Sequence, residues 1–350
     1  ATLDTSGRWS VGVPAADVSA LAAGDYTITA ALTDKAGNSN STTHEVEVNL
    51  TAPVLTIDTV SGDDVINSSE KTQDLTITGT ASGLAAGAVV TVMLNGKAYS
   101  ATVDTNGQWT TTVPASEVGQ LGEALYTVSA SATDSVGNSS STSHTVNVES
   151  VLPGVIVNTI AGDDVINAAE KGADLVLSGS TSNVEENQTV TITFGGKSYT
   201  ATVGSDLKWS VTIPSADLQA FGDGDLTFSA SVTNAHGNTG TGERDININA
   251  ELPGLRVNTI SGDDVINAIE QQQDLAVTGS STHLAEGTQI TVTINNVEYV
   301  TTVNASGNWQ IGVPAADLQA WTAGGMTVSV SAEDAWGNTV AAEHPIELDL

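Results

Sequence analysis

The sequence predicts an all-β chain of tandem immunoglobulin-like β-sandwiches arranged in an extended rod. Three observations predict this fold: a repeat with a period of 100 residues, alternating apolar and polar residues within each repeat, and frequent turn signals. The segment Ser61–Asn67, SGDDVIN, returns as AGDDVIN at 161–167 and as SGDDVIN at 261–267. Because this period matches the size of a small domain, we expect each repeat to have its own hydrophobic core.

Proline-containing linkers divide the 350 residues into three complete repeats, 51–150, 151–250 and 251–350. The preceding residues 1–50 match only the C-terminal half of a repeat, so we expect the chain to be a fragment of a longer tandem protein. A tryptophan also recurs at this period, as Trp9, Trp109, Trp209 and Trp309, and we interpret it as core packing. Features that recur in this way are expected to be structural or metal-binding, whereas chemistry unique to one repeat would occur once.

Seven strands are predicted in the first complete repeat, at 54–57, 75–78, 90–94, 98–103, 109–113, 126–132 and 144–148. The third and fourth form a hairpin, because Asn95-Gly96 between them suits a type I′ turn. About seven short strands in about 100 residues, rich in the β-branched residues that suit a pleated surface, are typical of an immunoglobulin-like sandwich.

One helical turn is predicted between the fifth and sixth strands, at Pro114–Val118. Proline suits the first helical position, and Glu117 suits the positive end of the helix dipole. We expect Val118 and Leu121 to face the core. The acid is interpreted as a local cap in preference to a metal ligand.

The composition favours cations as partners. The formal net charge is −32, from 41 acidic and 9 basic residues, so phosphate backbones and anionic lipid are repelled and no nucleic acid partner is expected. No apolar run approaches the roughly 18 residues of a membrane span, so no membrane insertion is expected either. There is no cysteine, which excludes disulfides and leaves metal as the expected staple of a monomeric chain.

The segment after the first strand, 58–74, is rich in oxygen donors and is called the GDD loop below. Five of its positions are the same in all three complete repeats: Asp63, Asp64, Asn67, Glu70, Asp74; Asp163, Asp164, Asn167, Glu170, Asp174; and Asp263, Asp264, Asn267, Glu270, Asp274. Adjacent carboxylates repel each other unless a cation or several N–H donors neutralise them. Oxygen ligands without His or Cys select Ca²⁺ or Mg²⁺, and a loop with many oxygens favours Ca²⁺.

The GDD loop matches known calcium motifs only in part. It lacks the EF-hand spacing, and GDD occurs once per hundred residues, unlike the nonapeptide of β-rolls. The alternative is that Asp63 and Asn67 form Asx turns while Glu70 is solvated. We favour the metal-site hypothesis, because the neighbours of the five positions vary while the five do not.

A second polar cluster lies in the last hairpin, where Asp134 and Asp334 each precede a Gly-Asn pair. A turn is enough to explain the Gly-Asn pair. However, successive strands alternate in direction. The GDD loop is therefore expected at the end of the sandwich where the chain leaves it, and this hairpin at the end where the chain enters. In a tandem array the two face each other across the linker. This arrangement would allow a cation to link Asp163, Asp164 and Glu170 to Asp334 or Asn338, close to Glu251.

These motifs resemble the bacterial Ig-like repeats of giant adhesins exported by type I secretion. The residues that carry the resemblance are GDDVINxxE after a short strand, TDxxGN before the last strand and the linker prolines, and they cover the whole chain. The resemblance implies a secreted rod at the bacterial surface with calcium at its domain junctions. It also implies that neighbouring repeats and host-cell glycans or glycoproteins are the partners.

Two other classes of function are an enzyme and a module that recognises glycans directly. We do not expect an enzyme, because His44, His144 and His344 share a repeat position with Arg244, which indicates a replaceable side chain on a solvent face. Direct glycan recognition would require exposed aromatic side chains. Trp321 aligns with Leu121 and is explained as core, whereas Trp336 falls at a loop tip that needs no indole. We expect Trp336 either to contact a ligand or to pack on the preceding domain.

Overall fold

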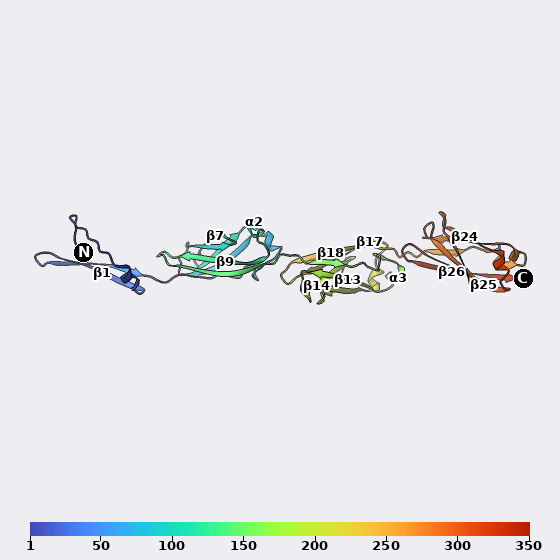
Figure 1. Ribbon diagram of the computed structural model, residues 1–350, viewed down its shortest axis with the longest axis horizontal. Helices are drawn as coiled ribbons and strands as arrows, with labels where there is room; N and C mark the ends of the chain where they lie inside the picture. Colours follow the sequence, from blue (N-terminus) through green and yellow to red (C-terminus); the bar gives the residue numbers. More distant parts are fainter. The chain divides into compact units, whose positions relative to one another are not determined.

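Each complete repeat folds into two stacked β-sheets, one of three strands and one of five, which confirms the predicted fold class (Figure 1). The computed structural model describes residues 1–350. These residues form two units, Ala1–Val151 and Leu152–Leu350. None of the helices is long and apolar enough to cross a membrane.

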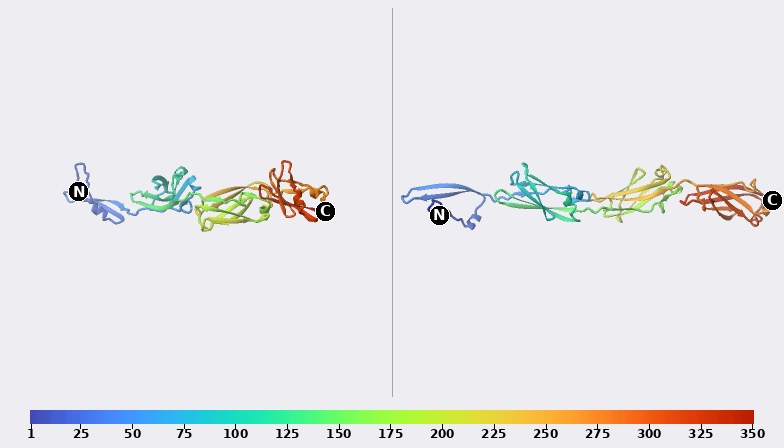
Figure 2. Two further views of the ribbon diagram at one scale, coloured as in Figure 1. Left: turned by 45° about the vertical axis from the view of Figure 1, so that its right-hand side comes forward. Right: turned by 90° about the horizontal axis from the view of Figure 1, so that it is seen from above.

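The first unit opens with a partial repeat and continues with a complete one. Residues 1–50 form the helical turn α1 (Ala15–Ser19) and the hairpin of β1 (Gly24–Thr33) and β2 (Ser39–Val48), the blue ribbon of Figure 2, and none of their side chains is buried. The complete repeat contains β3 (Val54–Leu55), β4 (Val65–Ile66), the 3₁₀ turn η1 (Glu70–Thr72), β5 (Leu75–Ser82), β6 (Val89–Leu94), β7 (Lys97–Thr102), β8 (Gln108–Val113), α2 (Ala115–Val118), β9 (Ala124–Thr133) and β10 (Ser139–Val148).

The second unit contains two complete repeats with the same order of elements. The first has β11 (Gly154–Val157), β12 (Val165–Ile166), α3 (Ala168–Lys171), β13 (Leu175–Ser182), β14 (Thr189–Phe194), β15 (Lys197–Thr202), β16 (Lys208–Ile213), α4 (Ser215–Leu218), β17 (Gly224–Thr233) and β18 (Thr239–Ile248). The second has β19 (Gly254–Val257), β20 (Val265–Asn267), η2 (Glu270–Gln272), β21 (Leu275–Thr282), β22 (Gln289–Ile294), β23 (Val297–Thr302), β24 (Asn308–Val313), α5 (Ala315–Leu318), β25 (Gly324–Glu333) and β26 (Thr339–Asp349).

The strand count differs from the sequence prediction by one. The small sheet has the order β3-β5-β8 and the large sheet the order β4-β10-β9-β6-β7, and the other repeats follow the same scheme. The unpredicted strand is β4, which lies within the GDD loop and pairs in parallel with β10. Two residues carry no periodicity, so the pattern of apolar residues did not reveal this strand.

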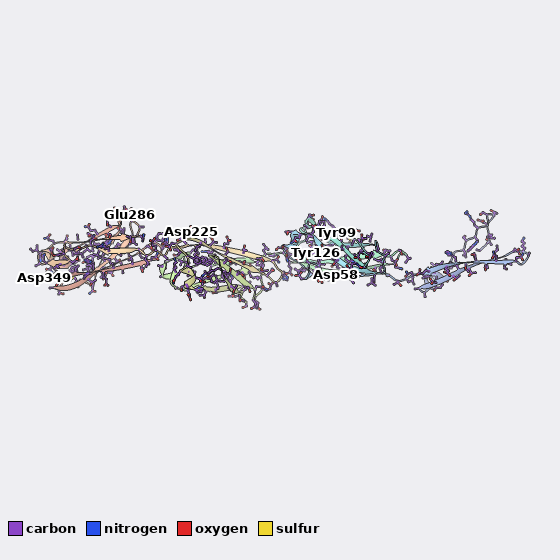
Figure 3. The ribbon with its side chains drawn as sticks, turned by 180° about the vertical axis from the view of Figure 1, so that it is seen from behind. Asp58, Tyr99, Tyr126, Asp225, Glu286 and Asp349 are labelled. Atoms are coloured by element: carbon purple, nitrogen blue, oxygen red, sulfur yellow. The ribbon has the colours of Figure 1, made fainter.

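The hydrophobic core of each complete repeat contains its repeated tryptophan. Trp109, Trp209 and Trp309 are each only 2% exposed, which confirms their predicted packing role, whereas Trp9 is 49% exposed because residues 1–50 supply no facing sheet. Tyr99 and Tyr126, labelled in Figure 3, pack against the core of the first complete repeat. Trp321 is buried as predicted.

The predicted helical turn is present, but its acid has another role. Val118 and Leu121 are buried, as expected. Pro114 is the N-cap residue of α2, and Glu117 makes no capping hydrogen bond and instead forms an ion pair with Lys97. The interpretation of Glu117 as a cap is therefore wrong. The N–H group of Ala115 donates instead to Asp74 of the GDD loop, at 2.7 Å.

A strand glycine beneath each tryptophan is required by close packing. A Cβ atom at Gly279 would lie 2.1 Å from the carbonyl oxygen of Arg256 and 2.2 Å from Cζ2 of Trp309. Gly279→Ala is therefore expected to destabilise repeat 251–350 by about 2–3 kcal/mol, as overpacked cores do. Chemical denaturation would measure this loss. The control is Gly312→Ala on the neighbouring strand, because a Cβ atom at Gly312 would have no neighbouring atom within 4 Å. Equal stability of the two variants would contradict the packing argument.

Candidate functional site

The GDD loop is folded back on itself by the second aspartate of its motif. Asp64 adopts a left-handed backbone conformation with φ of 65°, and its Oδ1 accepts a hydrogen bond of 2.7 Å from the N–H group of Val60. The backbone carbonyl of Asp64 accepts from the N–H group of Asn147 at 2.8 Å, where β10 passes. The carboxylate thus closes the loop, and the backbone of the same residue attaches it to the last strand.

A basic side chain from the last strand faces this carboxylate in every complete repeat. The Nε2 atoms of His144 and His344 lie 2.7 Å from Asp64 and Asp264, respectively. In the middle repeat Arg244 binds Asp164 through Nε at 2.8 Å and through a second guanidinium nitrogen. The prediction of a histidine on a solvent face is therefore wrong: this position supplies the partner of the loop aspartate.

These contacts lower the carboxyl pKa values. The guanidinium group of Arg244 holds the pKa of Asp164 below its ordinary value of 3.8. His344, together with the N–H group of Ile260, lowers the pKa of Asp264. Partial burial raises the pKa of Asp64, but the hydrogen bonds from Val60 and His144 outweigh it, so the net direction is again downward. The aspartates are accordingly ionised at neutral pH.

The remaining four positions of the GDD loop organise its backbone. Asp63 accepts from the N–H group of Val65 at 3.0 Å. Asn67 accepts from Glu70 N–H at 3.1 Å, while Glu70 accepts from Asn67 N–H at 2.9 Å, which is the reciprocal arrangement of a capping box. The same contacts recur in the other two repeats, including the contacts of Asp174 with Ser215 and Asp274 with Ala315.

The structure does not gather these acids into one chelating cluster. No group of three or more His, Cys, Asp or Glu side chains is placed to hold a metal ion. Asp63 and Asp64 point to different N–H groups, and Asp74 reaches the helical turn α2. Each of these contacts uses one carboxylate oxygen, whereas Arg244 engages both oxygens of Asp164 in the middle repeat. The carboxylate and amide oxygens are of the kind that calcium binds, but the structure does not bring them together around one point. A bound ion would also need carbonyl or water oxygens as ligands.

The hairpin before the last strand is also closed by its aspartate. Asp134 accepts from the N–H groups of Val136 at 3.0 Å and Asn138 at 2.8 Å, and from the Asn138 side chain at 2.9 Å. The Asn138 side chain lowers the pKa of Asp134 most strongly. Asp334 has the same three contacts with Trp336 and Asn338. Both aspartates thus serve the turn.

Within the second unit, the hairpin of repeat 251–350 contacts the GDD loop of repeat 151–250, as predicted. Asn338 is only 2% exposed, and its Oδ1 accepts a hydrogen bond of 2.7 Å from the N–H group of Ala168, the first residue of α3. Its Nδ2 donates to the linker carbonyl of Asn249 at 3.0 Å. A direct hydrogen bond thus joins the loops, while the linker residue Glu251 pairs with His283, at 3.4 Å.

Two neighbouring residues at the tip of this hairpin differ in their packing. Gly337 approaches so closely that a Cβ atom there would lie 3.1 Å from Nδ2 of Asn167, and its φ of 83° also favours glycine. Trp336, one position earlier, keeps 42% of its surface exposed. The hairpin tip therefore has a tightly packed side and a solvent-facing indole.

Sequence reasoning missed the partners of the loop aspartates. Asp64, Asp164 and Asp264 lie 80 residues before their basic partners. The signal was present, since a basic residue recurs at this place in each complete repeat. Alternation of His with Arg at one position indicates a need for a side-chain N–H donor, which the solvent-face interpretation overlooked.

Comparisons with known proteins agree with this architecture. Residues 48–150 match the family model described as bacterial Ig-like domain. No curated protein matches the sequence. Among solved structures, the chain is similar to a Ca²⁺-stabilized adhesin that helps an Antarctic bacterium reach out and bind ice, with 34% identity over 100% of this chain and 87% of that one and a TM-score of 0.47.

Two other solved adhesins are similar. One is a 1.5-MDa bacterial ice-binding adhesin, with 32% identity over 86% of this chain and 100% of that one and a TM-score of 0.45. The other is a tetra-tandem repeat from the extending region of a large adhesion protein, with 26% identity over 95% and 83% and a TM-score of 0.36. Residues 48–150 belong to the bacterial Ig-like domain family. Because the following repeats share its strand order and motifs, the chain is a tandem array of such domains.

The pairing of Arg244 with Asp164 has a defined pH dependence. Because the pKa of Asp164 is lowered in the folded state, the pair stabilises the loop fully above the ordinary carboxyl pKa of 3.8, and this stability is lost as the pH falls through the folded-state pKa. Arg244→Gln is expected to speed hydrogen exchange of the Asn247 N–H group at neutral pH, with a difference from the native protein that shrinks below the ordinary pKa. Lys208→Gln, which removes an exposed ion pair with Asp206, is the control. A difference that is independent of pH would contradict the role of the carboxylate.

The Asn338 contact predicts a specific loss. Asn338→Ala leaves the N–H group of Ala168 and the carbonyl of Asn249 without this partner, at an expected cost of about 1–3 kcal/mol. Hydrogen exchange at Ala168 should become faster, and thermal unfolding of the second unit should begin earlier. The control is Asn308→Ala at an exposed strand position. Unchanged protection at Ala168 would show that the contact does not hold the two loops together.

Proposed function

We propose that this chain is a calcium-stiffened segment of a large bacterial surface adhesin and that it acts as a non-catalytic array in contact with host cells. One observation carries the proposal: three consecutive sandwiches have the same acidic loop in the same hydrogen-bonded shape. A loop that recurs so closely in every repeat indicates a property of the whole array, because one copy of a recognition site would be enough for an adhesin.

The case for calcium rests on charge and on the kind of oxygen present. The net charge of −32 disfavours close approach of acidic loops unless counter-ions bind. Extracellular calcium sites combine carboxylates with backbone carbonyls and water, with dissociation constants of about 10⁻⁴–10⁻³ M. Asp163 and Glu170 are the proposed ligands from one repeat, with Asp334 or Asn338 from the facing hairpin, whereas both oxygens of Asp164 are engaged by Arg244. The calcium that stabilises one similar adhesin is consistent with this proposal.

The proposed location is outside the cell, at the bacterial surface. Free calcium is abundant there, so the loops would bind it after export and the array would stiffen. The proposed partners are the adjoining repeats and host-cell glycans or glycoproteins. The non-catalytic role is supported by Arg244, which makes in the middle repeat the same contact with the loop aspartate that His144 and His344 make in the other two.

Direct recognition by repeat 251–350 is a second candidate function, favoured by Trp336. Its indole is 42% exposed at the tip of a hairpin. Indoles supply a large contact surface at binding sites. Trp336→Ala is expected to reduce binding of the chain to host cells without changing its melting temperature. Loss of melting temperature with unchanged cell binding would assign the indole to packing.

Calcium binding predicts a selective rise in stability. Calcium at tenfold above the dissociation constant should stabilise each site by about 1.4 kcal/mol. The melting temperature is measured in excess chelator, then with millimolar calcium or magnesium. The expected rise is selective for calcium and is reduced by Asp163→Asn, which removes a carboxylate without touching the pair of Asp164 and Arg244.

The matched control is Asp206→Asn, an exposed acid in a turn of the same repeat. Equal melting with and without calcium would eliminate calcium stiffening and leave an Ig-like spacer. If the calcium-dependent rise in melting temperature persists in Asp163→Asn but is lost in Asp334→Asn, the ion is bound by the hairpin and not by the GDD loop.

A further inference from the structure

The linker between the two repeats of the second unit is held by its backbone N–H groups. Asn249 follows the last strand of the first of these repeats, and its N–H group donates to the carbonyl of Ile166 at 3.0 Å. The next two N–H groups, those of Ala250 and Glu251, both donate to Oδ2 of Asp223 at 3.0 Å. Three consecutive backbone donors of the linker are therefore bound to the preceding repeat.

Asp223 is itself held by a lysine. Nζ of Lys171, the last residue of α3, lies 3.6 Å from Oδ1 of Asp223, and only 17% of the lysine side chain is exposed. A lysine is rarely so well covered unless its charge is paired. The carboxylate thus uses one oxygen for the linker and the other for the lysine, which ties the linker to the helical turn of the GDD loop.

The following repeat holds the same linker by other groups. The carbonyl of Asn249 accepts from the side chain of Asn338, and the carboxylate of Glu251 pairs with His283. The preceding repeat therefore binds the N–H groups of the linker, and the following repeat binds a carbonyl and a side chain. Because ordering a backbone residue costs conformational entropy, contacts on both sides are needed to keep a linker in one conformation.

The contact of a carboxylate with a linker N–H group also occurs at the end of repeat 51–150. Glu123 stands at the position of Asp223, and it accepts from the N–H group of Ser150 at 3.0 Å and from the hydroxyl of the same serine. Nζ of Lys71 lies 3.2 Å from that hydroxyl. The Ser150 hydroxyl holds the pKa of Glu123 below its ordinary value. The arrangement therefore recurs with a longer acidic side chain.

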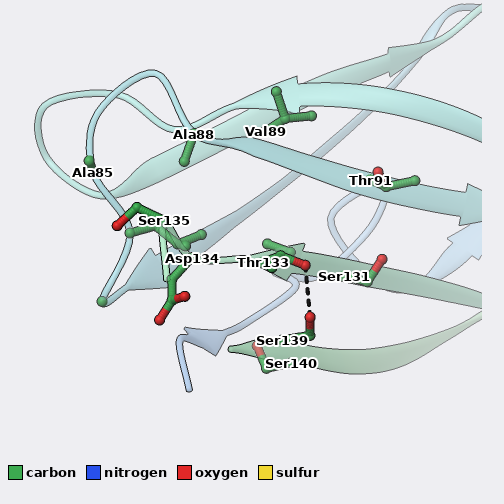
Figure 4. A pocket seen from close by; sticks show the side chains of 13 residues that line it. Ala85, Ala88, Val89, Thr91, Ser131, Thr133, Asp134, Ser135, Ser139 and Ser140 are labelled. Carbon is green, nitrogen blue, oxygen red and sulfur yellow. Dashed lines mark hydrogen bonds between the residues drawn. The ribbon is translucent and has the colours of Figure 1, made fainter. Parts of the chain in front are cut away.

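The linker at the start of repeat 51–150 has the carbonyl contact as well. Figure 4 shows the hairpin that follows β9, with Asp134 at its start, next to a groove lined by residues of β6 and β9. A hydrogen bond of 2.8 Å between Thr133 and Ser139 joins the ends of the two strands. Asn138 of this hairpin donates to the carbonyl of Asn49 at 3.2 Å, as Asn338 does to Asn249.

The N–H groups of this first linker have no carboxylate partner from the preceding residues. The N–H group of Thr51 donates to the side chain of Asn49, within the linker itself, at 3.0 Å. The position of Glu123 and Asp223 is occupied by Ala23, which has no acceptor in its side chain. The carbonyl contact and the carboxylate contact are therefore separate features of a linker, and one can occur without the other.

We propose that Asp223, held by Lys171, is a clamp that fixes the linker between the two repeats of the second unit without calcium. The clamp acts through the N–H groups of Ala250 and Glu251, and it uses none of the proposed calcium ligands. The inference goes beyond calcium stiffening, because it assigns the order of this linker to groups of the protein. A linker with alanine at the clamp position, as after residue 23, is the more flexible kind.

The test measures the distance between two spin labels on the full chain, together with hydrogen exchange. The chain has no cysteine, so Thr202→Cys and Thr302→Cys place one label at the same exposed position in each repeat of the second unit. In excess chelator, the distribution of this distance should be narrow, and Asp223→Ala should broaden it. Asp223→Ala should also speed exchange of the Ala250 and Glu251 N–H groups roughly tenfold, the effect of losing a hydrogen bond to a charged group.

Two further variants serve as controls. Asp223→Glu should behave as the native chain, because Glu123 makes the same contact in the preceding repeat. Asp225→Ala removes the same charge two residues away, from a side chain that binds Asn247 and not the linker, so exchange at the linker should stay slow. Exchange in Asp223→Ala that is as slow as in Asp225→Ala would overturn the proposal.

Repeating the distance measurement with millimolar calcium separates the clamp from calcium stiffening. A distribution that is narrow in chelator and unchanged by calcium supports the clamp and contradicts calcium stiffening at this linker. A distribution that is broad in chelator and becomes narrow only with calcium overturns the clamp and supports calcium stiffening.

Discussion

The GDD loop of each sandwich depends on one interaction, the pairing of its second aspartate with a His or Arg side chain of the last strand. Asp164 illustrates this dependence, because its side chain binds Arg244 and the N–H group of Ile160 while its carbonyl binds Asn247 of the last strand. The parallel pairing of β12 with β18 follows directly after these contacts. The other two repeats make the same attachment and the same parallel pairing with His144 and His344 in place of the guanidinium group.

The position of the loop then determines what lies at the pole of the sandwich. Once β12 is fixed, Asn167 begins α3 with a capping box, and the N–H group of Ala168 is left facing outward as an unpaired helix N-terminus. Asn338 satisfies that group, and its own position depends on Asp334. The chain of contacts from Arg244 to Asn338 therefore links an ion pair within one repeat to a hydrogen bond between two repeats of the second unit.

The sequence revealed local patterns and repeats, and it missed contacts between segments that are distant in the chain. The sandwich fold followed from alternation and from the 100-residue repeat, and the facing of the GDD loop and the hairpin followed from strand direction. The strand β4 was missed because it is two residues long. The pairing of Asp64 with His144 spans 80 residues, and Asp74 caps a helix 41 residues away. Such contacts depend on how the sheets stack, which no local pattern encodes.

The repeated and unrepeated residues of this chain therefore have different meanings. Residues that are invariant across the repeats, such as Asp64, Asn67 and Trp109, hold backbone or core in the same way each time. A side chain that differs at one position changes the surface without changing the fold: an indole stands at the tip of the hairpin in repeat 251–350, where the other complete repeats have valine or histidine. A tandem array can thus keep one scaffold throughout and change the surface of single repeats by one or two substitutions, because the hydrogen bonds that define the loops are made by other residues.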